Sequence, residues 1–164
     1  MNARNDGGRA DQEAARDAAA PKLRRLDHVA ILVRDTNEAV KHYEQALGLR
    51  LISSETVKAL SVRLSYLDCG NAFLQLVEPL DPASALAAVL EERGEGLHHI
   101  CFAVDDVKAA VSAMRGRDDL PLGTGRGRPS AFVDDGDQHG VRIECTQFDL
   151  TKDVVERAGY LHDD

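Results

Sequence analysis

Four polar side chains interrupt apolar runs of this sequence. His28 stands in LDHVAILVRD, His99 in LHHICFAVDD, Gln75 in AFLQLVEP and Glu144 in VRIECTQ. Two imidazole nitrogens and two side-chain oxygens, without a thiolate, suit a divalent ion such as cobalt, manganese, nickel or zinc that keeps positions open for water or substrate. The sequence therefore predicts a metal site at His28, Gln75, His99 and Glu144, provided that the fold brings them together.

An internal repeat relates the two histidines. The segment LDHVAILVRDTNEAV (26–40) aligns with LHHICFAVDDVKAAV (97–111) at six identical positions of fifteen, and the two histidines fall opposite each other. Each segment reads as an apolar strand, an aspartate at the turn and then a helix. We therefore expect two copies of one supersecondary unit.

Each copy continues with further strands. In the first, a strand over 26–33 precedes a helix that Asp35 caps, with Glu38 three residues later and Gly48 at the end; strands follow over 49–55, 61–68 and 71–78. In the second, a strand over 97–104 and a helix over 106–116 precede strands near 119–123, 129–134 and 140–147. The helices should pack through Ala39, Val40, Tyr43 and Leu47, and through Val107, Ala110, Val111 and Met114.

These elements predict an α+β fold in which two βαβββ modules form a cupped, eight-stranded mixed sheet. Module one spans 23–80 and module two 95–148, and a linking helix over 81–94 begins at Asp81-Pro82 and ends at Gly94. We expect a disordered N-terminal arm over 1–22 and a C-terminal tail over 149–164.

Strand alternation places the histidines on one face. If Val29, Ile31 and Val33 pack under the first helix, His28 faces the other side. The same parity puts His99 on that side in the second copy and His98 under the helix. The alternative is that each polar residue is a satisfied core residue, the commoner role for a lone strand histidine. Four such residues at repeat-related positions favour the metal site.

Composition excludes several classes of protein. With 20 Lys and Arg against 28 Asp and Glu, the net charge of −8 argues against a nucleic-acid or anionic-membrane partner. Aromatic residues make up only 4% and Trp is absent, which argues against a base-stacking surface. The chain shows neither a secretory signal nor a long apolar span, and its three cysteines lack CxxC spacing, so we expect a cytoplasmic protein.

On these residues the chain resembles the vicinal oxygen chelate superfamily of glyoxalases, bleomycin-resistance proteins and dioxygenases, and within it the methylmalonyl-CoA epimerases. The resemblance covers about residues 24–147, and its most specific stretch is LQLVEPLDPASALAAVLEERGEGLHHICFAVDDV. In that family a His, a Gln, a second His and a Glu hold the metal. These positions fall on His28, Gln75, His99 and Glu144, the set that the repeat and strand parity predict.

The resemblance implies an isomerase. Its substrate would be an acyl-CoA: a 2-substituted malonyl thioester, methylmalonyl-CoA first, epimerised by α-proton abstraction through a metal-chelated enolate. It further implies that Glu144 moves a proton while bound to the metal, and that the chain forms a homodimer.

Two departures from the family bear on catalysis. Some epimerases carry a second catalytic glutamate where this chain has Leu64, and the family tends to show His-Pro-Lys where this chain has Val133-Asp134-Asp135. The opposing acid/base therefore stays open among Glu55, Tyr66 and a metal-bound water.

The substrate-binding residues are not assigned by the sequence. Arg126 and Arg128, in the glycine-rich segment 123–128, could meet anionic parts of a substrate at the cavity mouth or could be solvated. Two other functions remain: a glyoxalase-like metal-dependent lyase or isomerase acting on another small dicarbonyl compound, and a non-catalytic binding or resistance protein.

Overall fold

The computed structural model describes residues 22–115, 122–133 and 139–151. The first half contains β1 (Leu23–Leu32), α2 (Thr36–Leu47), β2 (Arg50–Val57), the 3-10 turn η1 (Lys58–Leu60), β3 (Val62–Asp68) and β4 (Phe73–Pro79). The second half contains α3 (Ala85–Arg93), β5 (Gly96–Val104), α4 (Val107–Arg115), β6 (Gly123–Gly125), β7 (Arg128–Phe132) and β8 (Ile143–Gln147). Nearly all of the expected arm over 1–22 and most of the tail over 149–164 lie outside the described residues.

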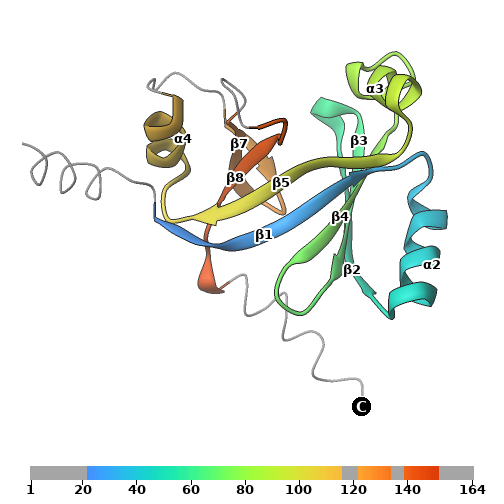
Figure 1. Ribbon diagram of the computed structural model, residues 1–164, viewed down its shortest axis with the longest axis horizontal. Helices are drawn as coiled ribbons and strands as arrows, with labels where there is room; N and C mark the ends of the chain where they lie inside the picture. The colour runs from blue at the N-terminus through green and yellow to red at the C-terminus, as the bar shows by residue number, and fades with distance from the viewer. Residues whose placement is uncertain (1–21, 116–121, 134–138, 152–164) are drawn as a thin grey trace, which may run out of the picture.

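The strands form one eight-stranded mixed sheet in the order β2-β3-β4-β1-β5-β8-β7-β6. Strands β1 and β5, the first of each module, pair antiparallel at the centre, and each pairs in parallel with the last strand of its own module. The sheet curls into a half-barrel, with α2 and α4 at opposite ends of the molecule (Figure 1). The predicted fold of two βαβββ modules is confirmed.

The helix ends follow from local capping. The Asp35 carboxylate accepts hydrogen bonds from the backbone N–H groups of Asn37 and Glu38, and Gly48 ends α2 with a φ of 67°. The linking helix begins later than expected, at Ala85, because Ser84 is its cap and accepts a hydrogen bond from the Ala87 N–H. Asp81 instead holds the N–H of Ala83 in the preceding turn.

Core packing confirms the predicted strand parity. Ile31 and Val33 pack with Ala39, Val40 and Tyr43 of α2. On the other face, Ala30, Leu32 and Val77 pack with Leu90 of α3, so α3 lies on the concave side of the sheet. A third cluster buries the α4 side chains Val107, Ala110 and Val111 against Val104 and Cys145.

The prediction that Leu47 and Met114 help to pack the two helices on the sheet is wrong. Leu47 is 66% exposed and Met114 is 41% exposed. Both stand in the last turn of their helices, beyond the residues that pack on the sheet. No helix within the described ranges is long and apolar enough to cross a membrane.

Candidate metal centre

Two cross-strand rows bring the four predicted residues to one face of the sheet. In the first row His28 pairs with Cys101, and Cys101 with Glu144, across β1, β5 and β8. In the second, Ala30 pairs with Gln75 of β4 on one side and with His99 of β5 on the other. Directly paired residues project from the same face of a sheet. The rows therefore surround Ala30 and Cys101, two small and fully buried side chains.

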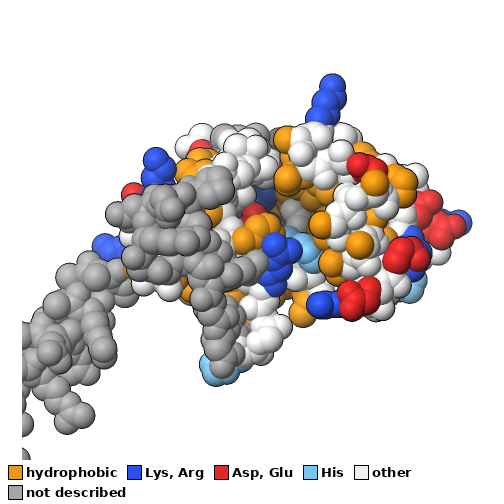
Figure 2. Space-filling model, turned by 90° about the horizontal axis from the view of Figure 1, so that it is seen from above, with side chains coloured by type: hydrophobic (Ala, Val, Ile, Leu, Met, Phe, Trp, Pro, Cys, Tyr) orange, Lys and Arg blue, Asp and Glu red, His pale blue; other side chains and the backbone are white. Residues whose placement is uncertain are grey.

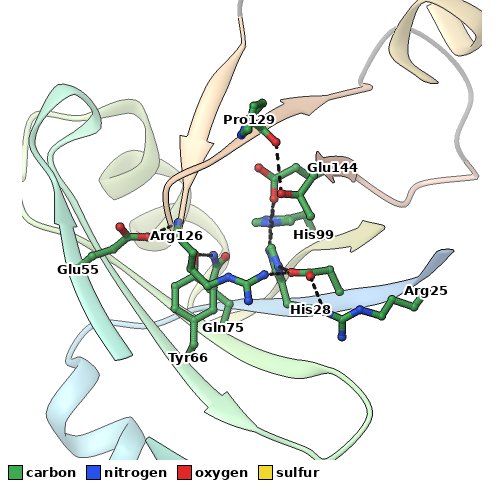
Figure 3. A network of polar contacts seen from close by, with 11 residues as sticks. Arg25, His28, Glu55, Tyr66, Gln75, His99, Arg126, Pro129 and Glu144 are labelled. Atoms are coloured by element: carbon green, nitrogen blue, oxygen red, sulfur yellow. Dashed lines mark hydrogen bonds and ion pairs between the residues drawn. The ribbon is translucent and has the colours of Figure 1, made fainter. Parts of the chain in front are cut away.

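Three of the four side chains meet directly. The Nε2 atoms of His28 and His99 are 3.2 Å apart, and the Glu144 Oε2 atom lies 3.3 Å from the first and 3.2 Å from the second. Both histidines are buried, and Glu144 is nearly so (Figure 3). Each offers one ligand atom, and these three atoms all lie within 4.8 Å of one another.

The contacts within the cluster and its burial shift the pKa values of its members in different directions. Burial alone would raise the pKa of Glu144, but hydrogen bonds to His28 and His99 outweigh it and hold that pKa well below its usual range. Burial also opposes protonation of His28, yet Asp27 and Glu144 raise its pKa. Burial lowers the pKa of His99. Glu144 is therefore a carboxylate, and His99 favours the neutral form that binds metals.

Asp27 is a site residue that the sequence analysis missed. It is fully buried, and its Oδ1 accepts a hydrogen bond from His28 Nδ1 at 2.9 Å, so Nε2 is the nitrogen that faces the cluster. Burial raises the pKa of Asp27, but the bond from His28 and the charge of Arg126 bring it down to about 2. The available signal was a carboxylate directly before the histidine in LDHVAIL.

His98 supports the second histidine. Its Nδ1 lies 2.8 Å from His99 Nδ1, and its Nε2 lies 2.9 Å from Arg142 Nη1. The sequence placed His98 under the helix and gave it no part in the site. Because His98 contacts the Nδ1 atom of His99, the Nε2 atom of His99 faces the cluster. Asp27 orients His28 in the same way.

Gln75 tests whether the residues fit a metal ion. Its Nε2 donates a hydrogen bond of 2.7 Å to the Tyr66 hydroxyl, which fixes the orientation of the amide. Its Oε1 is buried and has no hydrogen-bond partner among the described residues. Such an oxygen is costly to bury unless a partner satisfies it. A divalent ion beside His28, His99 and Glu144 would do so, and the donor set fits that ion.

The glycine-rich segment reaches into the cup. The Arg126 side chain is only 6% exposed and forms an ion pair with Asp27. Its guanidinium carbon lies 4.9 Å from the centre of the Tyr66 ring and 4.7 Å from that of Phe73. Arg128 is 1% exposed, so the alternative that it is a solvated loop residue is wrong. Burial raises the pKa of the Tyr66 phenol.

The concave face is open to view from one side. Figure 2 shows the molecule hollowed near its centre, with hydrophobic, basic and histidine side chains around the hollow. Of the segment Val133-Asp134-Asp135, only Val133 lies within the described residues, and it is buried in the cluster beneath α4.

The fold and the cluster on its concave face define a class of protein. The family model of the Glyoxalase/Bleomycin resistance protein/Dioxygenase superfamily matches residues 27–131, and the chain belongs to this superfamily. It is 32% identical over 130 residues to the uncharacterized protein YqjC of Bacillus subtilis, covering 76% of this chain and 93% of YqjC. It is 31% identical over 132 residues to the mitochondrial methylmalonyl-CoA epimerase of Homo sapiens, covering 76% and 74% of the two chains.

A solved structure agrees with this relation. A variant of Streptomyces coelicolor methylmalonyl-CoA epimerase, in complex with 2-nitronate-propionyl-CoA, superposes with a TM-score of 0.68. The two sequences are 29% identical, and the match covers 77% of this chain and 98% of that one. The resemblance to the epimerase family is therefore confirmed at the level of fold and sequence.

Proposed function

We propose that this protein is a metal-dependent epimerase of a 2-substituted malonyl thioester, methylmalonyl-CoA first among the candidates. The observation that carries the proposal is the cluster of His28, His99 and Glu144, whose ligand atoms lie within 4.8 Å of one another on the concave face. Relatives that bear the name methylmalonyl-CoA epimerase, and a related structure that holds an acyl-CoA analogue, support the substrate class.

The residues divide the work between binding and proton transfer. His28, Gln75, His99 and Glu144 would hold the ion, and a divalent ion in that place supplies positive charge to the enolate of a 1,3-dicarbonyl substrate. Asp27 keeps the Nε2 atom of His28 directed at the cluster. Glu144 exchanges the α-proton on one face of the substrate.

The proposal extends to the metal and to the assembly. Cobalt, manganese, nickel and zinc all suit two nitrogen and two oxygen donors. We further propose a cytoplasmic homodimer, in which the partner covers sheet edges, with no nucleic-acid or membrane partner. Light scattering across a wide concentration range tests the dimer, and a mass near the 17.8 kDa of one chain throughout would contradict it.

Solvent exchange of the α-proton tests the activity. Metal-loaded protein is mixed with methylmalonyl-CoA in deuterium oxide, and the proton NMR signal of the α-hydrogen is followed. We expect that signal to disappear at a rate proportional to enzyme concentration, and to persist with His28→Ala. Wild-type protein with its metal bound and no exchange above the uncatalysed rate would show the proposal to be wrong.

The buried position of Arg126 favours a second candidate, a glyoxalase-like lyase or isomerase that acts on another small dicarbonyl compound. Its guanidinium lies within the cup, over Tyr66 and Phe73, where it could pair with an additional carboxylate of such a substrate. Turnover of a small dicarbonyl without exchange of methylmalonyl-CoA would select this candidate. Binding without turnover of either would indicate a sequestering protein.

A further inference from the structure

A second carboxylate, Glu55, lies on the same face of the sheet as the cluster. Glu55 in β2 pairs directly with Leu64 in β3, and Leu64 pairs with Val77 in β4, which pairs with Leu32. Leu32 and Val77 belong to the concave face, on which α3 packs. Because paired residues project from the same side, the Glu55 side chain also belongs to the concave face.

A backbone hydrogen bond fixes the Glu55 carboxylate. Its Oε1 accepts the N–H of Arg126 at 2.8 Å, although 71 residues separate them. Arg126 stands in the turn between β6 and β7 with a φ of 52°, and its side chain continues into the cup towards Asp27. Figure 3 shows Glu55 at one side of the cup and Glu144 at the other, with Arg126, Tyr66 and Gln75 between them.

The charges of both carboxylates, Glu55 and Glu144, act on the pKa of Tyr66. Burial is the main cause that raises the pKa of this phenol, and the negative charges of Glu55 and Glu144 raise it further. Tyr66 is fully buried and pairs with Gln75, so both carboxylates act on the floor of one cup.

Three other ionisable groups beside the cluster are poorly suited to proton transfer. Tyr66 accepts a hydrogen bond from Gln75, and its raised pKa makes the phenolate scarce near neutral pH. Asp27 accepts a hydrogen bond from His28 and forms ion pairs with Arg25 and Arg126, so its carboxylate is already engaged. Burial raises the pKa of the Cys101 thiol well above its usual value.

We propose that Glu55 is the acid/base that faces Glu144 across the substrate, which would make it the second catalytic residue of the epimerisation. This assignment rests on the proposed function, because inversion at carbon requires a proton to leave one face and another to arrive at the opposite face. Glu55 occupies the outer strand β2, directly beside Leu64, so a carboxylate from the neighbouring strand acts where β3 has an inert side chain.

The proton balance is complete. In one direction the Glu144 carboxylate takes the α-proton, and the electron pair of the broken C–H bond moves into the enolate. The protonated carboxyl group of Glu55 then gives its proton to the α-carbon on the opposite face, and the electron pair of the enolate forms the new C–H bond. The substrate loses and gains one proton, Glu144 ends protonated and Glu55 ionised, and proton exchange with water restores both.

The test is Glu55→Gln, assayed on each epimer of methylmalonyl-CoA separately in deuterium oxide. Glutamine keeps an oxygen that can accept the Arg126 N–H, but it cannot take a proton. Glu78→Gln is the matched control. The pair of Glu78 with Arg63 is next to the concave pair of Val77 with Leu64, and successive side chains of a strand alternate between faces, so Glu78 lies on the opposite face of the same sheet. Metal occupancy and the thermal unfolding midpoint are measured on every preparation, and we expect both to match wild type in Glu55→Gln.

We expect inversion of both epimers by Glu55→Gln to fall about 10²–10⁴-fold, the usual effect of losing a general base. Exchange without inversion should continue for the epimer whose α-hydrogen faces Glu144 and should cease for the other. Wild-type inversion rates in Glu55→Gln would overturn the assignment, as would an equal loss of exchange from both epimers at full metal occupancy. If wild type itself moves no α-proton, the proposed function is wrong and the assignment of Glu55 fails with it.

Discussion

The Nε2 atoms of His28 and His99 lie 3.2 Å apart, although 71 residues separate them in the chain. They come together because β1 and β5, the equivalent strands of the two modules, pair antiparallel at the centre of the sheet. Each module therefore supplies one imidazole to a single cluster. Glu144 closes the cluster from β8, so neither module contains the whole site.

Because both modules supply ligands, we predict one divalent ion per chain, and removal of the histidine from either module should abolish its binding. His28→Ala and His99→Ala should each abolish tight binding, as measured by calorimetry and by metal analysis after dialysis. His98→Ala should retain the ion at saturating metal, with affinity about 10–100-fold lower, since His98 contacts the Nδ1 atom of His99 and not the Nε2 atom that faces the cluster. Equal and complete loss in all three variants would contradict this division of roles.

Glu144 should act as more than a ligand. Glu144→Gln keeps an oxygen donor of the same shape but removes the base, so turnover should fall about 10²–10⁴-fold while metal occupancy changes much less. Turnover and occupancy must come from the same preparation. If the variant exchanges the α-protons of both epimers of methylmalonyl-CoA as fast as wild type, Glu144 only binds the metal.

Asp27 should make the stability of the metal-free protein depend on pH. Its folded pKa of about 2 lies below the unfolded value of about 3.9, so its contribution is fully present above about pH 5 and is lost as the pH falls towards 2. The free energy of unfolding of Asp27→Asn should lie below that of wild type at neutral pH, by about 3 kcal/mol for a broken buried pair.

Urea unfolding at a series of pH values measures this difference. The gap between wild type and Asp27→Asn should narrow as the pH falls, because acid protonates the wild-type carboxyl group. A gap that stays constant between about pH 5 and pH 2 would show that the ionised state of Asp27 does not stabilise the fold.

The three cysteines should differ in reactivity. Burial raises the pKa values of all three thiols, that of Cys101 well above its usual value and that of Cys145 to about 11. Cys69 is nevertheless exposed, whereas Cys101 and Cys145 are buried and closed to a reagent. A thiol reagent at mildly alkaline pH should therefore modify one cysteine in the folded protein and all three after denaturation. Mass spectrometry of the labelled peptides identifies which thiol has reacted.

Much of the architecture follows from the sequence alone, because it depends on local patterns. Strand alternation placed His28 and His99 on one face, and helix periodicity with capping by Asp35 and Gly48 predicted α2. The internal repeat then showed that the same choice occurs twice. These signals are local because side-chain direction in a strand or helix follows from backbone geometry over a few residues.

The tertiary structure decided what no local pattern encodes. The contacts of Arg126 with Asp27 and of Glu55 with the Arg126 backbone join segments far apart in the chain, and the exposure of Leu47 depends on where α2 stops packing on the sheet. The Gln75 side-chain oxygen, which has no hydrogen-bond partner among the described residues, could be recognised only once the positions of its neighbours were known. Such relations depend on strand register across modules and on the curvature of the sheet, which are set by the packing of the whole chain.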